Sequence, residues 1–165
     1  MIDAPMTKRE EVFISFSDDD KKYFYEMKHF IDLLKIDCNI KHWHCKLLEY
    51  GDKWDENIHK HMAVTKVGVL MVSQAFLASG YIRNQELPIL LQAAKDNQIC
   101  IMWIPIKPST VKFSPIDLKN GDKVYIDKYQ AVCNPEKPLS TLRPSEREDI
   151  YVNLYHAIRR YFESN

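Results

Sequence analysis

Side chains that can bind a metal ion gather in one stretch of the sequence. His42, His44 and Cys45 lie close together, and His59 and His61 follow within the next predicted helix. His42 and His44 would share one face of a strand, whereas His59 and His61 would point in different directions from a helix. No HExxH or similar ligand spacing accompanies them. Solvated or core histidines account better for this pattern, and we expect no metal site.

A second candidate for chemistry is the carboxylate of Glu86, in the segment RNQELP. Pro88 is tolerated only in the first turn of a helix and disfavours helical geometry at Leu87, so Glu86 is predicted at or just before a helix N-terminus. The helix dipole favours an ionised carboxylate there. From position alone, such a glutamate more often complements the dipole than takes part in a reaction. Nucleophilic triads have less support, because no nucleophile elbow is present.

The elements that must position these side chains alternate between strand and helix. Predicted strands lie at Val12–Phe16, Cys38–His44, Val67–Val72 and Ile99–Ile104. Apolar residues at helical spacing follow each of the first three strands, and the helix after the third is predicted to run to about Asn97. This order predicts an α/β fold in three layers, a flavodoxin-like parallel sheet with helices on both faces.

The last third of the chain has a weaker pattern. Residues 107–143 are rich in proline and are predicted as long loops, with at most a short strand at Val124–Ile126. Ser145 and Glu148 form a capping-box pattern, which predicts a C-terminal helix over about residues 145–163.

Length and composition limit the class of protein. The 165 residues favour one domain, at 11–165, after an N-terminal tail at 1–10. Basic and acidic residues balance, so no footprint for direct nucleic-acid binding is expected. The chain lacks a long apolar run or a secretory leader, so we expect no membrane partner. Four cysteines without CxxC spacing are typical of reduced thiols in a cytoplasmic protein.

In a parallel α/β sheet, ligands bind beyond the carboxyl ends of the strands. Three segments are predicted to meet there: Phe16–Asp19, His44–Asp52 and Ser73–Glu86. Phe16, Ser17 and Asp18 are candidate substrate contacts by this location, or equally a buried aromatic residue followed by helix caps. Trp43 is a candidate for lining the pocket, although a tryptophan of the core is the more common arrangement.

Four motifs along residues 11–110 resemble those of a bacterial Toll/interleukin-1 receptor (TIR) domain: FISFS, LLEYGDKW, LMVSQAF and YIRNQELPILL. The resemblance implies that Cys45–Asp52, around Gly51, is the mobile loop called the BB loop. It also implies that Glu86, at the head of the helix after the third strand, is catalytic. Three further residues become candidate substrate contacts: His44, Gly51 and Arg83.

Enzymatic TIR domains cleave the bond between nicotinamide and ribose in NAD+, so the resemblance implies an NAD+ glycohydrolase. NAD+ is then the substrate, no other cofactor is expected, and the products are nicotinamide and ADP-ribose or a cyclic form. Nicotinamide leaves as a neutral molecule, so little general-acid help is needed, while a fixed carboxylate can stabilise the oxocarbenium-like ribose. Enzymes of this family act when assembled, so other copies of the chain are expected partners. Prokaryotic relatives commonly serve antiphage defence with a separate sensor domain or protein.

Two positions depart from the family pattern. Many relatives carry an aspartate where this chain has His44, and many carry a tryptophan where it has Val111, with Trp103 inside the fourth strand instead. Stacking on the nucleotide of a neighbouring copy would then need another aromatic residue or be weaker. These departures favour the alternative function, a non-enzymatic adaptor that joins other TIR domains.

Overall fold

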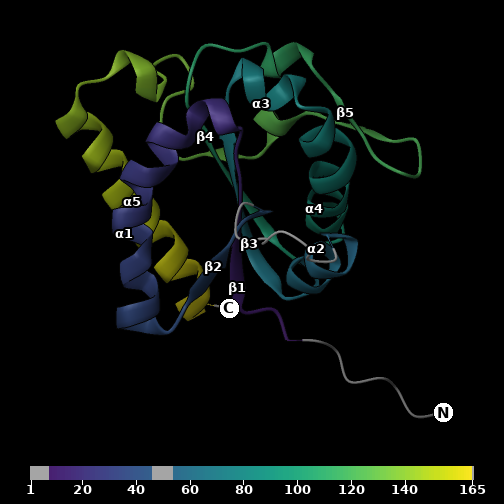
Figure 1. Ribbon diagram of the computed structural model, residues 1–165, viewed down its shortest axis with the longest axis horizontal. Coiled ribbons are helices and arrows are strands. Elements are labelled where there is room, and N and C mark those ends of the chain that lie inside the picture. The colour runs from purple at the N-terminus through teal and green to yellow at the C-terminus, as the bar shows by residue number, and fades with distance from the viewer. Residues whose placement is uncertain (1–7, 46–53, 165) are drawn as a thin grey trace.

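A five-stranded parallel sheet forms the centre of the computed structural model, which describes residues 8–45 and 54–164. Helices α1 and α5 cover one face of the sheet, and α2 and α4 cover the other (Figure 1). The predicted three-layer α/β fold is therefore confirmed. The strands of this sheet are β1 (Glu11–Ser15), β2 (Lys41–Trp43), β3 (Thr65–Val72), β4 (Cys100–Pro105) and β7 (Gln130–Ala131). The α-helices are α1 (Lys21–Cys38), α2 (Trp54–Ala63), α3 (Gln74–Ala78), α4 (Leu87–Lys95) and α5 (Pro144–Ser164).

The strand order is β2-β1-β3-β4-β7. The chain places β2 on one side of β1 and β3 on the other, so the order reverses between β1 and β3. In flavodoxin-like sheets this switch point opens a crevice at the carboxyl ends of the strands. The topology therefore puts a ligand site at the end of β1.

Each strand sends alternate side chains to opposite faces of the sheet. From β1, Val12 and Ile14 join the core under α1 and α5, while Phe13 joins the core under α2 and α4. Ser15 shares the face of Phe13 and is fully buried. A hydroxyl therefore lies on the α4 side of the sheet, at the last residue of β1.

The predicted second strand, Cys38–His44, was too long at both ends. Cys38 is the last residue of α1, and Asn39 ends that helix with a left-handed backbone, φ 55°. Asparagine tolerates this conformation better than most residues. The strand itself covers only Lys41–Trp43, so His44 lies just beyond its carboxyl end.

The prediction of a single helix after β3 was also wrong. The chain forms α3, then a π-helix at Ile82–Glu86, and only then α4. In a continuous α-helix the ring of Pro88 would clash with the carbonyl group four residues earlier. The wider π turn avoids this clash, and such turns are frequent at functional sites. Glu86 is thus the residue directly before α4, but inside a helical run and not at a free N-terminus.

The proline-rich region contains structure that its pattern did not predict. β7 pairs with β4 as the fifth strand, and β5 (Ile116–Asp117) pairs with β6 (Lys123–Val124) in a small antiparallel sheet. β6 replaces the short strand predicted at Val124–Ile126. The fourth strand, predicted at Ile99–Ile104, is shifted by one residue and covers Cys100–Pro105.

Helix α5 begins one residue before its predicted start and is capped differently. Glu146, not Glu148, accepts the hydrogen bond of the capping box, from the backbone N–H of Arg143 at 3.3 Å. Pro144 follows at the first helical position, where its missing N–H has no cost.

The N-terminal tail predicted at residues 1–10 is anchored near its end, since Arg9 donates to the backbone carbonyl of Met62 at 2.9 Å. In the described part of the chain, none of the helices is long and apolar enough to cross a membrane.

A partly buried ion pair joins α1 to α5. Arg147 donates two hydrogen bonds of 2.9 Å to the carboxylate of Glu26, and Tyr151 donates a third, at 2.8 Å. The hydrogen bond from Arg147 is the main cause that holds the pKa of Glu26 below its ordinary value. A carboxyl whose pKa is lower in the folded state adds stability above its unfolded pKa, about 4.5, and loses it as the pH falls through the folded pKa.

We therefore expect Glu26→Gln to lower the free energy of unfolding at pH 7 by about 1–3 kcal/mol, because a hydrogen-bonded charge is lost. The variant should also lose less stability than the wild type between neutral pH and acid. Urea unfolding at a series of pH values measures both effects. Glu163→Gln is the control, since Glu163 also pairs with an arginine but is exposed. An equally steep acid dependence in Glu26→Gln and the wild type would contradict the assignment.

Candidate active site

A pocket of about 340 Å³ lies at the carboxyl ends of β1 and β2, beside the π-helix. Its lining residues come from three segments that are far apart in the sequence: Ile14, Phe16, Ser17 and Asp18; His44 and Cys45; and Ser79, Tyr81, Ile82 and Glu86. These are the three segments that the sequence predicted to meet. A second cavity, of about 360 Å³, lies against α2, α4 and the residues just before β4, and Glu86 does not line it.

Glu86 is the buried carboxylate of this pocket, with 3% of its surface exposed. The Ser15 hydroxyl donates to its Oε2 at 2.9 Å, and the Cys45 thiol donates to its Oε1 at 3.1 Å. The Tyr81 hydroxyl lies 3.6 Å from the same sulfur. Burial of a charge is costly unless hydrogen bonds replace its water. Both carboxylate oxygens have such a bond, so the group is held in one orientation.

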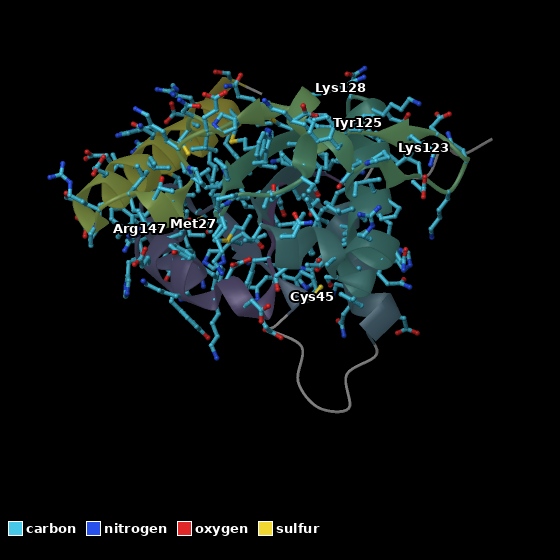
Figure 2. The ribbon with its side chains drawn as sticks, turned by 90° about the horizontal axis from the view of Figure 1, so that it is seen from above. Met27, Cys45, Lys123, Tyr125, Lys128 and Arg147 are labelled. Atoms are coloured by element: carbon cyan, nitrogen blue, oxygen red, sulfur yellow. The ribbon has the colours of Figure 1, made fainter. Side chains whose placement is uncertain are left out.

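Three elements fix this arrangement. Ser15 is the last residue of β1, Cys45 lies two residues beyond β2, and Glu86 ends the π-helix before Pro88. Because β1 and β2 are parallel neighbours, their carboxyl ends present both donors at the same edge of the sheet. Figure 2 shows Cys45 well apart from Met27 and Arg147, which belong to α1 and α5.

Aromatic rings form one wall of the pocket. Phe16 stacks on Phe24 with ring centroids 4.2 Å apart, and His44 meets Phe24 edge-on at 4.6 Å. His44 is buried, with 6% of its surface exposed. His44 therefore packs among aromatic rings. A flat, partly apolar ring of a ligand suits such a wall.

The acidic run after β1 is held by a local cap and by contacts with two other loops. The Ser17 hydroxyl accepts from the backbone N–H of Asp19 and caps the short 3-10 turn Asp18–Asp20. Asp20 makes no capping bond to α1. It is fully buried, accepts a hydrogen bond from Ser73, and pairs with Lys107 at 2.9 Å. The loops after β1, β3 and β4 are thereby joined, and the hydrogen bond to Asp20 raises the pKa of Lys107.

The predicted substrate contacts divide into two groups. Phe16, Ser17, Asp18 and His44 line the pocket together with Glu86. Trp43 and Arg83 do not line it. Gly51 lies outside the described residues, as does the rest of the predicted BB loop after Cys45.

Trp43 and Arg83 have other partners. Trp43 is buried, lies 5.2 Å from the ring of Phe13, and stacks on His61 at 4.3 Å. Trp43 therefore belongs to the core, as the sequence favoured, and does not line the pocket. The Arg83 guanidinium donates to the backbone carbonyls of Leu77 and Pro115, at 3.1 and 2.9 Å. It ties α3 to the segment before β5 and is not among the residues that line the pocket.

Three of the histidines considered as metal ligands, His42, His44 and His61, pair with carboxylates or aromatic rings. His42 lies 2.6 Å from Asp32, and His61 lies 3.0 Å from Glu11. Within residues 8–45 and 54–164, no three histidine, cysteine or acidic side chains are grouped to hold a metal ion. All four cysteines are free thiols.

Sequence reasoning missed three contributors to the site. Ser15 carried a signal, because it is a hydroxyl in an otherwise apolar strand, at the end where ligands bind. Tyr81 stands in the motif YIRNQELPILL, but only the fold turns it toward Cys45. Cys45 was considered as a metal ligand and loop residue, and nothing in the sequence pairs it with Glu86.

An exposed aromatic residue lies outside the pocket, on the loop after β4. Val111 is buried in the core, whereas Phe113, two residues later, has 84% of its surface exposed. The loop is held firmly, since the backbone N–H of Thr110 donates to Gln74 at 2.9 Å and the hydroxyls of Thr110 and Ser114 lie 2.8 Å apart. A large apolar side chain is therefore presented to solvent from a fixed turn.

A family model described as "TIR domain" matches residues 12–142. Among solved structures, the chain is similar to the TIR domains in a structure of the activated Roq1 resistosome directly recognizing the pathogen effector XopQ. The identity is 22% and the TM-score is 0.49. The similarity covers 62% of this chain and 62% of the solved one, which is less than two thirds of its length. No curated protein matches this chain.

Proposed function

The chain belongs to the TIR domain family, and from this premise we propose that it is an NAD+ glycohydrolase in which Glu86 is the catalytic carboxylate. One observation carries the proposal. A buried glutamate, with both oxygens hydrogen-bonded, lines a pocket at the switch point of the sheet. This is where the fold class binds ligands, and a preorganised carboxylate suits a reaction that develops positive charge.

The chemistry follows from the charge of the substrate. The bond between C1′ of the ribose and the nicotinamide nitrogen breaks, and its electron pair stays on the nitrogen, so the cationic ring leaves neutral. The ribose becomes oxocarbenium-like and is stabilised by the negative charge of Glu86. Water then attacks C1′ and loses a proton, which gives ADP-ribose; attack by the substrate's own adenine gives a cyclic form instead. No second carboxylate is needed as a general acid, because the leaving group is already activated.

The pocket supplies the remaining contacts. The rings of Phe16 and Tyr81 offer flat apolar surface, and the carboxylates of Asp18 and Glu86 attract the cationic ring.

We propose that activity depends on assembly of several copies, and that Phe113 is the aromatic residue that one copy presents to the next. Its exposure and its rigid loop suit an interface anchor. The proposed setting is an effector in prokaryotic antiphage defence.

The direct test is to incubate NAD+ with the protein at concentrations from dilute to crowded, and to quantify nicotinamide. We expect release, and we expect the activity per molecule to rise with concentration. A constant activity per molecule would contradict the dependence on assembly. No release under any condition would support a non-enzymatic adaptor, the function favoured by His44 in place of an aspartate and by the buried Val111.

A further inference from the structure

The two oxygens of the Glu86 carboxylate have donors of unequal strength. A serine hydroxyl holds Oε2 and a cysteine thiol holds Oε1, at 2.9 and 3.1 Å. A hydroxyl is a strong donor, whereas a thiol is a weak one. Ser15 is fully buried in β1 and is absent from the pocket lining, while Cys45 is part of that lining. The carboxylate is thus held at Oε2 by a serine of the sheet, whereas at Oε1 it accepts a weaker hydrogen bond from a residue of the pocket lining.

The role that we assign to these two donors rests on the proposed function. We propose that Ser15 is a positioning residue for Glu86, and that the Cys45 thiol occupies the place on Oε1 that a ribose hydroxyl of the substrate takes. When substrate binds, its O–H replaces the S–H as donor to Oε1, and Ser15 keeps Oε2. No covalent bond changes. The exchange is favourable because an O–H bond to a carboxylate is stronger than an S–H bond.

The first test removes the anchor. Ser15→Ala should lower kcat by about 10-fold to 100-fold and leave KM nearly unchanged, because an interaction that orients the catalytic charge is lost. Ser15→Thr, which restores a hydroxyl and suits a strand, should recover most of kcat. Thr65→Val is the matched control. It removes a buried hydroxyl of β3, bonded to the carbonyl of His61 at 2.8 Å, and should leave kcat unchanged. Wild-type kcat in a folded Ser15→Ala protein would overturn the assignment.

The second test removes the Cys45 donor in one variant and replaces it with a stronger donor in another. Cys45→Ala removes the competitor for Oε1 and should lower KM, whereas Cys45→Ser provides a stronger competitor and should raise it. We expect a difference of about 10-fold in KM between the two variants. Cys133→Ala is the control, since Cys133 is partly buried against the core under α1 and α5, and burial raises the pKa of its thiol to about 11. A shift of KM in the same direction in both Cys45 variants would overturn the proposal.

A third readout does not depend on turnover. The infrared S–H stretching band of Cys45 is isolated by subtracting the spectrum of Cys45→Ala. Glu86→Gln should weaken the hydrogen bond and move this band to higher frequency. A carbocyclic NAD+ analogue, which is not cleaved, should change the band in the wild type by displacing the thiol. If the wild type releases no nicotinamide but the analogue moves the band, the proposed reaction fails and the exchange at Oε1 stands. A band that neither Glu86→Gln nor the analogue moves overturns the exchange.

Discussion

Glu86→Gln is expected to lower the rate of nicotinamide release by a factor of about 10² or more. Glutamine keeps the size and shape of the side chain and removes its charge, so the variant loses the electrostatic stabilisation of the oxocarbenium-like ribose. The fold should persist. The Ser15 hydroxyl can rotate to accept from the glutamine amide, while the amide oxygen still accepts from the Cys45 thiol. Nicotinamide release at a fixed, crowded protein concentration measures the effect.

A control variant separates charge loss in general from charge loss at the site. Glu148→Gln neutralises an exposed carboxylate on α5, which packs on the opposite face of the sheet, and should leave turnover unchanged. Thermal unfolding of both variants checks that each is folded. Wild-type turnover in folded Glu86→Gln would refute the catalytic role, and Glu86 would then be a buried structural glutamate.

Phe113→Ala is expected to lower the activity of concentrated protein by about 10-fold or more. Truncation of an aromatic anchor at an interface commonly costs about 2 kcal/mol or more of association free energy. The loss should be confined to the concentration range in which copies assemble. The free energy of unfolding should stay the same, because Phe113 is 84% exposed and supports no core. Enzyme assays over a dilution series, with light scattering for assembly, measure both.

Tyr25→Ala is the matched control for this prediction. Tyr25 is also an exposed aromatic residue, with 59% of its surface accessible, but it lies on α1. We expect it to change concentrated activity much less than Phe113→Ala. Equal assembly and equal activity of Phe113→Ala and the wild type would remove this loop from the interface.

Local pattern was enough to predict the layers of the fold. The continuous apolar run at Val67–Val72 predicted a central strand, because only a strand covered on both faces can bury every side chain. Pro88 placed Glu86 directly before α4, because proline is tolerated in the first turn of a helix, although Leu87 kept the helical geometry that the proline was expected to disfavour. The strand-then-helix order placed Phe16 and His44 at the same edge of the sheet as Glu86. These inferences succeeded because each depends on neighbours in the sequence.

Tertiary structure decided the partners. Glu86 is bonded to Ser15 and Cys45, 71 and 41 residues away, and no spacing rule links such positions. The two-residue strand β7 has no periodicity of its own and becomes a strand because the open edge of β4 accepts it. Arg83 stands in the motif YIRNQELPILL beside Glu86, yet it donates to the backbone carbonyls of Leu77 and Pro115. Residue type and order determined which groups are present at the site, whereas the packing of distant segments determined which of them meet.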